Sequence, residues 1–292
     1  MHAPDPERAA QTTKMNEINA IVTKKLKNFR NFSLSNFEGK QEFQDYPVLG
    51  PYQYKSDDTT YYGQFKEGRR HGRGEQTWPD GSIYRGYWKN DQSDGLGIQV
   101  YATGDVFKGN WRNGMSHGFG EYFHASEKIS YKGDWERGAQ HGEGIETYAD
   151  GSSYRGQFHE SEKHGLGKFT WPDGATYEGQ FVRNNIEGEG VYIWADNRRY
   201  EGEWAENKMN GVGVFTWPDG RVYKGKYFND LKHGRGEFRW ADGRKFVGNW
   251  KNGKQDGEGV YQDKDGRSRR GVWKMGEKIR WLDDGPSEFI AD

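Results

Sequence analysis

The stretch HGLGKFTWPDGATYEGQF, residues 164 to 181, decides the fold because it sets glycines between large aromatic side chains. The chain of 292 residues contains 43 Gly together with 12 Trp, 18 Tyr and 16 Phe. Flexible glycine-rich linkers have few aromatic residues, so this composition is not that of a linker. Glycine must therefore have a structural task beside the rings.

Composition narrows the classes of function. The chain has 43 basic and 44 acidic residues, and this balance argues against nucleic acid as the main partner, because nucleic-acid-binding proteins carry a basic excess. Cysteine is absent, which excludes disulfides and thiolate chemistry. The start, MHAPDPERAAQTTK, contains no apolar segment, so we expect no secretory signal. No apolar run approaches the ~20 residues that span a bilayer.

The opening stretch is one unit of a tandem repeat. A motif Y-x-G-x-[WFY] recurs every 23 residues, with one residue inserted after the third copy. Its first residue, position 1 of each repeat, is Tyr61, Tyr84, Phe107, Tyr131, Tyr154, Tyr177, Tyr200, Tyr223, Phe246 and, in a decayed copy, Arg269. A G-x-G follows at positions 12 and 14, and Trp-Pro-Asp-Gly or a variant at positions 18 to 21. The array extends over residues 49–281, after a partial leading copy.

Alternation of side chains predicts two strands in each repeat. Positions 1, 3 and 5 share one face and carry an aromatic residue, Gly and an aromatic residue, whereas positions 2 and 4 are mostly charged or amide residues. On the second strand, positions 12, 14, 16 and 18 should share the aromatic face. Trp-Pro-Asp-Gly predicts a tight turn, and the other connection, such as VRNNIEG, predicts a longer polar loop.

Glycine then makes room for rings, because a neighbour without a Cβ leaves space on the pleated surface. Burying one ring covers ~150–250 Å² and offsets the entropy that glycine loses, roughly 0.5–1 kcal/mol. A lone hairpin is marginal, so stability must come from stacked repeats. We therefore predict an all-β fold, an elongated, twisted antiparallel sheet of tandem 23-residue β-hairpins.

The pattern Y-x-G-x-W…G-x-G-x-x-x-W-P-D-G resembles the MORN repeat over roughly residues 49–281. The resemblance implies a sheet of hairpins with an aromatic groove. It also implies scaffolding or tethering in ciliary and flagellar structures, cytoskeletal assemblies or membrane junctions. Two places depart from the pattern: Arg269 replaces the leading Tyr, and ADNRR at 195–199 replaces PDGxx.

Sites for catalysis or cofactors are not expected. The G-x-G pairs lie in hairpins without a following helix, so they are not phosphate loops. One histidine per repeat at position 11, about 10 Å from the next, cannot chelate a metal and is interpreted as a polar turn residue. These histidines are His71, His117, His141, His164 and His233. The acidic residues point outward, and no catalytic domain fits beside the array, so we predict no enzyme activity and no cofactor.

The extension of residues 1–48 contains an amphipathic pattern over residues 14–30. Helical spacing sets Ile18, Val22, Leu26 and Phe29 on one face, with lysines beside them. This predicted helix could pack on its own sheet, for example over the first edge strand, dock on another protein or lie on an anionic membrane. The short apolar face and Glu17 argue against the membrane. Residues 282–292 form an acidic tail.

The sequence predicts a non-enzymatic scaffold. The resemblance to the MORN repeat implies a setting in the cytoplasm, in a ciliary or flagellar axoneme or another cytoskeletal assembly. Its partners would be other proteins of a large assembly, and homo-oligomers are left open. Partner segments would bind an aromatic groove at position 5: Phe65, Trp88, Trp111, Trp135, Phe158, Phe181, Trp204, Tyr227 and Trp250. Two alternatives are a peripheral tether that binds anionic lipid and a regulatory subunit of a separate enzyme.

Overall fold

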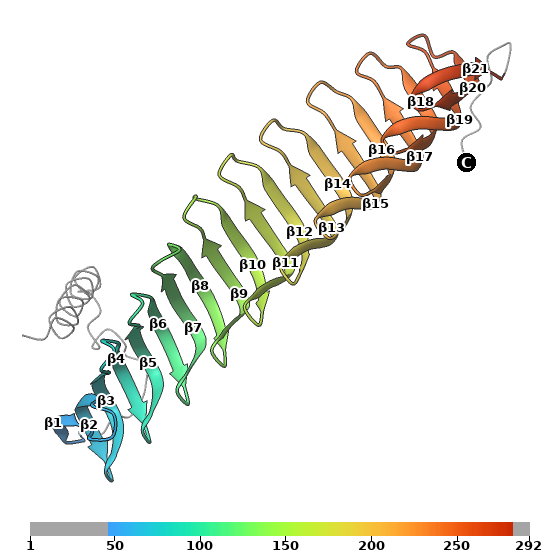
Figure 1. Ribbon diagram of the computed structural model, residues 1–292. Coiled ribbons are helices and arrows are strands. Elements are labelled where there is room, and N and C mark those ends of the chain that lie inside the picture. Colours follow the sequence, from blue (N-terminus) through green and yellow to red (C-terminus); the bar gives the residue numbers. More distant parts are fainter. Residues whose placement is uncertain (1–45, 283–292) are drawn as a thin grey trace, which may run out of the picture. The chain divides into compact units, whose positions relative to one another are not determined.

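A computed structural model of the protein describes residues 46–282 (Figure 1). This part of the chain is all-β, with 21 strands assigned to one sheet, which confirms the predicted antiparallel hairpin fold. The predicted helix over residues 14–30 and residues 283–292 of the predicted tail lie outside the described residues. Residues 46–282 contain no helix, and therefore none that could cross a membrane.

The lengths of successive strands alternate between about seven and nine residues, so each repeat contributes one shorter and one longer strand. Their bounds are β1 Val48–Gln53, β2 Thr60–Lys66, β3 Arg69–Thr77, β4 Ile83–Lys89, β5 Gln92–Val100, β6 Val106–Arg112, β7 Met115–His124, β8 Ile129–Glu136, β9 Ala139–Thr147, β10 Ser153–His159, β11 Glu162–Thr170, β12 Thr176–Val182, β13 Asn185–Ile193, β14 Arg199–Ala205, β15 Lys208–Thr216, β16 Val222–Phe228, β17 Leu231–Arg239, β18 Lys245–Lys251, β19 Lys254–Gln262, β20 Ser268–Lys274 and β21 Glu277–Trp281.

The strands form two compact units. The described part of unit 1 comprises residues 46–150 and 158–161, and that of unit 2 comprises residues 151–157 and 162–282. Unit 1 holds β1 to β9, unit 2 holds β11 to β21, and β10 contributes residues to both. Within each unit, successive strands pair antiparallel in chain order, as the ribbon in Figure 1 shows.

Glycines face glycines across these strands. Gly179 of β12 lies opposite Gly190 of β13, which lies opposite Gly202 of β14. The ring of Tyr177 fills the space that the missing side chains leave: a Cβ built on Gly190 would lie 2.5 and 2.6 Å from the Cζ and Cε2 atoms of that ring. The prediction that glycine makes room for rings is confirmed.

The leading tyrosines are among the most buried side chains of the described residues. Tyr177 has no exposed surface, and its hydroxyl donates a hydrogen bond to the Gln180 carbonyl at 3.1 Å. Burial raises the pKa of this hydroxyl far above its usual value. The same bond to the carbonyl three residues on is made by Tyr61, Tyr84, Tyr131, Tyr154, Tyr200 and Tyr223. Each tyrosine therefore lies along its own strand.

The Trp-Pro-Asp-Gly turn has the predicted form. In the turn after β11, the Gly174 amide donates to the Trp171 carbonyl at 3.0 Å, and Gly174 has a φ of +89°. Asp173 adds a bond that the sequence argument did not foresee, because its Oδ1 accepts the Ala175 amide at 2.9 Å. The Asp173 carboxylate thus stabilises the turn through a side-chain hydrogen bond.

The other turn is shorter than predicted. Only Arg183 and Asn184 separate β12 from β13, and both have positive φ, 47° and 69°. This is the geometry of a two-residue type I′ turn, whose twist matches that of the flanking strands. The expected longer loop is therefore wrong, because most of its residues belong to the next strand.

A bulge in every second strand accounts for the difference. Gly179 pairs with Gly190 while Gln180 pairs with Glu187, so the second strand carries extra residues at this point. Gly188, at position 12, has a φ of +61° there, and a Cβ on it would meet the Gln180 side chain and not a ring. Position 12 therefore does not share the aromatic face, contrary to the prediction.

Candidate protein-binding surface

One row of rings, the tyrosine row, consists of positions 1 and 5. Tyr177 contacts Phe181 of its own repeat and Trp204 of the next, with centroids 5.2 and 5.6 Å apart and planes near perpendicular. Edge-to-face contacts of this kind add ~0.5–1.5 kcal/mol each to the burial of the rings. The indole of Trp204 also donates to the Gly190 carbonyl at 3.2 Å. Within each unit, the tyrosine row thus links each repeat to its neighbour.

The position 5 rings predicted to form a partner groove all lie in the tyrosine row. Six of them are buried, with 3 to 7% of their surface exposed: Trp88, Phe158, Phe181, Trp204, Tyr227 and Trp250. The other three, Phe65, Trp111 and Trp135, are half-buried. Binding of a partner by these rings stays a prediction, but most of their surface already packs within the sheet.

A second row, the tryptophan row, lies in unit 2 at positions 16 and 18 and ends at Trp281. Its members are Phe169, Trp171, Tyr192, Trp194, Phe215, Trp217, Phe238, Trp240, Tyr261 and Trp281. Consecutive rings contact one another with centroids 4.3 to 6.3 Å apart, mostly tilted. All are half-buried except Phe215 and Phe238, which are buried. Unit 2 therefore has a continuous aromatic surface that is partly open to solvent.

Unit 1 lacks this continuity because polar residues occupy position 16. Gln76, Gln99 and Glu146 stand where unit 2 has a ring. Tyr122 is aromatic, but its hydroxyl donates to the Asp105 carboxylate at 3.1 Å. Each unit thus has its own tyrosine row, and the two units differ in the second row.

Arginines stack on the tryptophan row. Arg198, Arg221 and Arg244 occur at position 22 of three successive repeats, 5.2 to 5.3 Å from the centroids of the position 18 tryptophans. Each also forms an ion pair of 2.7 or 2.8 Å with the turn aspartate two residues before it. The side-chain and backbone hydrogen bonds of Arg221 hold the pKa of Asp219 below its usual value. A guanidinium group thus lies over the indole of each of three successive position 18 tryptophans.

Lys232 lies between the two rows. Its Nζ is 4.7 Å from the ring centroids of both Phe238 and Trp250, and Tyr223 and Trp217 complete a cage at 5.4 and 5.7 Å. Burial, with a smaller contribution from Arg221, lowers the pKa of Lys232 to about 8. The cation–π contacts favour the charged form and only partly offset this loss of hydration.

Comparison with models of known protein families identifies the repeat. The MORN repeat model matches nine tandem segments: residues 61–83, 84–106, 107–126, 131–153, 154–176, 177–197, 200–220, 223–243 and 246–266. The chain belongs to the MORN-repeat family. The matched segments follow the repeats read from the sequence, without the decayed copy from Arg269.

Solved structures that resemble this MORN-repeat chain include the TCP10 domain of Danio rerio CPAP. That domain has 13% identity and a TM-score of 0.40, with 70% of this chain and 97% of that chain covered. The SAS-4 (dCPAP) TCP domain of Drosophila melanogaster, solved with a proline-rich motif of Ana2 (dSTIL), has 14% identity and a TM-score of 0.27 over 62% of this chain and 85% of that chain. No curated protein matches the sequence.

Position 4 of the MORN repeat has a role that the sequence argument missed. The Gln157 side chain accepts the Leu166 amide of the bulge at 3.0 Å, and Glu203 accepts the Val212 amide at 2.8 Å. Gln64, Asp134 and Gln180 do the same in their repeats. The signal was present, because position 4 carries Gln, Glu, Asp or Asn in seven of the ten copies.

The position 11 histidines do not gather into a metal site. The Nε2 atom of His141 lies 3.6 Å from the Oε2 atom of Glu136. The ring centroids of His141 and His159 are 5.1 Å apart. His117 contacts the Arg112 guanidinium at 3.3 Å. Within residues 46–282, no group of three or more histidine, aspartate or glutamate side chains is placed to hold a metal ion.

Proposed function

We propose that this MORN-repeat chain is a non-enzymatic scaffold that binds segments of partner proteins along the tryptophan row. The observation that carries the proposal is the row itself: rings in continuous contact from Phe169 to Trp281, most of them half-exposed. Partly exposed aromatic surfaces of this extent mark interaction sites in soluble proteins. The partly exposed tryptophans, and not the buried position 5 rings, are therefore the residues to test first.

The chemistry of the row suits an extended or helical protein segment. Tryptophan and arginine are the residue types that contribute most to binding energy at protein interfaces. The Arg221–Asp219 pair beside Trp217 presents both signs of charge next to an apolar ring. A partner segment would set apolar side chains on the indoles and polar side chains on the Arg–Asp pairs.

The family resemblance supports a setting in the cytoplasm, in a ciliary or flagellar axoneme or another cytoskeletal assembly. Two other functions make different predictions. A peripheral membrane tether would sediment with anionic vesicles in a salt-dependent way, because surface electrostatics are screened by salt. A regulatory subunit would co-purify with an enzyme and change its rate. A scaffold would co-purify with structural proteins. It would not sediment with anionic vesicles, and it would not change the rate of an enzyme.

Co-purification with matched variants tests the proposal. The chain is isolated from its native source as wild type, as the pair Trp194→Ala and Trp217→Ala, and as Lys224→Glu, whose side chain is exposed. We expect the same partners with wild type and Lys224→Glu at similar yield, and loss of those partners with the tryptophan pair. Retention of all partners by a folded tryptophan pair would refute binding along this row.

A further inference from the structure

The face opposite the rings, the charged face, carries an apolar patch on β4 to β7 of unit 1. Ile83 pairs with Val100, Val100 with Val106 and Val106 with Phe123, so these four side chains lie side by side on four successive strands. Ile98 lies two residues from Val100 on the same face. Thr77 and Ser130 bound the row at its two ends.

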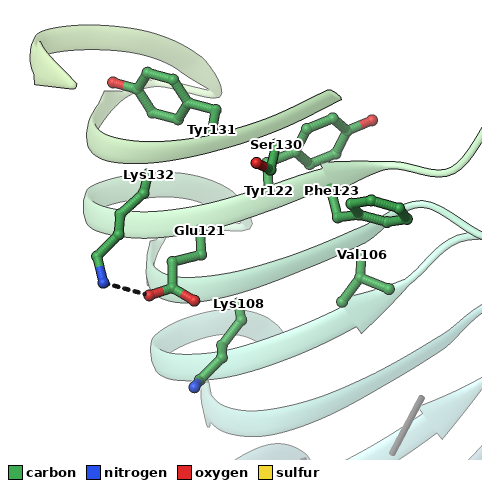
Figure 2. A pocket seen from close by; sticks show the side chains of 8 residues that line it. All are labelled: Val106, Lys108, Glu121, Tyr122, Phe123, Ser130, Tyr131 and Lys132. Atoms are coloured by element: carbon green, nitrogen blue, oxygen red, sulfur yellow. Dashed lines mark ion pairs between the residues drawn. The ribbon is translucent and has the colours of Figure 1, made fainter. Parts of the chain in front are cut away.

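Figure 2 shows part of this patch from close by. Val106 and Phe123 project from neighbouring strands into a hollow of about 310 Å³. Lys108, Glu121 and Lys132 line the same hollow, and the last two form an ion pair of 3.0 Å. The apolar patch thus lies beside a cross-strand ion pair on the charged face.

Three side chains of the patch are almost fully buried. Ile98, Val100 and Val106 expose 3, 4 and 4% of their surface. The same positions in other repeats are open: Ile145, which corresponds to Ile98, is 41% exposed, and Ile193, which corresponds to Val100, is 38% exposed. On one face of a sheet, deep burial of such side chains requires a covering layer. A segment of protein lying over β4 to β7 would account for this burial.

We propose that residues 14–30 of this chain are that covering layer. The predicted apolar stripe from Ile18 to Phe29 would be ~16 Å long at 1.5 Å per helical residue. Four strands at ~4.8 Å spacing give the patch a length of ~14 Å. A helix laid across the strands would therefore set its stripe along the row from Ile83 to Phe123. Its lysines would face solvent.

The connecting chain is long enough. β1 lies three strands from β4, about 14 Å at the usual spacing. The fifteen residues from 31 to 45 can span up to ~50 Å when extended. The proposal replaces the first edge strand with the charged face as the docking place, and it does not depend on the tryptophan row.

The absence of cysteine allows a direct test. Single variants Ile98→Cys and Ile145→Cys are made in the full chain, in a chain lacking residues 1–45, and in a full chain with Ser at Ile18, Val22, Leu26 and Phe29. The measurement is the rate of thiol modification by a bulky polar maleimide. Tryptophan fluorescence checks that each variant is folded.

We expect the thiol of Ile98→Cys to be protected in the full chain and to react about tenfold faster or more in the other two backgrounds, because protection follows the population of the open state. The thiol of Ile145→Cys should react quickly in all three. A peptide of residues 14–30, added to the truncated chain, should restore protection of the first thiol only.

Three results would overturn the proposal. Protection that persists after truncation would show that the sheet buries Ile98 by itself. Protection that falls on dilution would assign the cover to a second copy of the chain. Rapid reaction in the full chain, slowed only by anionic vesicles, would assign it to a membrane.

Discussion

Adding one methyl group to Gly190 tests the reason for glycine in this fold. In Gly190→Ala the new Cβ would meet two ring atoms and the hydroxyl oxygen of Tyr177, and this side chain is fully buried, so it has little room to move away. Overpacking of this kind costs ~1–3 kcal/mol, and displacing the Tyr177 hydroxyl from the Gln180 carbonyl costs a further ~0.5–1.5 kcal/mol. Alanine regains ~0.5–1 kcal/mol of backbone entropy. We expect a net loss of about 1–3 kcal/mol.

A double-mutant cycle separates this clash from a general preference for glycine. Tyr177→Ala alone should be strongly destabilising because it removes a buried ring, at a cost of about 3–5 kcal/mol. In that background Gly190→Ala should be neutral or stabilising, which gives a coupling of about 2 kcal/mol. Denaturant unfolding gives the free energies, and hydrogen exchange in β12 and β13 shows whether the loss is local. An equal cost of Gly190→Ala in both backgrounds would refute the argument.

Three further predictions concern single contacts. Lys232 has a folded pKa of about 8 against an ordinary 10.5, so the unfolded chain binds more protons between these values and stability should rise with pH from about 8 to 10.5. Lys232→Met should remove this rise and, at pH 7, stabilise the protein by ~1–2 kcal/mol after allowance for partial exposure; unchanged pH dependence in thermal unfolding would contradict this. Tyr223→Phe should cost ~1 kcal/mol, because it loses the bond to the Lys226 carbonyl, and no loss in denaturant unfolding would assign that tyrosine to packing alone. Gln157→Ala should speed hydrogen exchange of the Leu166 amide, whereas Arg155→Ala, on the same strand, should leave that rate unchanged.

The sequence was sufficient for the parts of the fold that repeat locally. The alternation of Tyr177, Gly179 and Phe181 placed rings and gaps on one face, and Gly174 identified the tight turn. These features depend only on neighbours within one strand or one turn, where side-chain alternation and glycine's access to positive φ apply directly.

The bulge could not be predicted from side-chain alternation within one strand. Extra residues beside Gly188 break the alternation, so position 12 turns to the other face and the expected long loop becomes a strand. A two-residue turn such as Arg183–Asn184 was readable in principle, because Gly, Asn or Asp occupies the second turn position in most repeats.

The candidate surface was predicted only in part. The sequence indicated that rings cover one face, but not which rings remain open. Burial of Phe181 and partial exposure of Trp217 depend on the cross-strand register and on the ring of the next repeat, which alternation does not determine. The apolar patch at Val100 and Val106 was also missed, because isolated aliphatic residues on a charged face become a row only once the register is known.

Site-specific photo-crosslinking tests the central claim most directly. A photoreactive phenylalanine analogue replaces Trp217 in one protein and Lys224 in another, and both are crosslinked in extracts of the native source. We predict a discrete crosslinked partner segment from the position of Trp217 and none from that of Lys224. Crosslinks from Lys224 with none from Trp217 would contradict the claim that the tryptophan row is where this protein holds its partners.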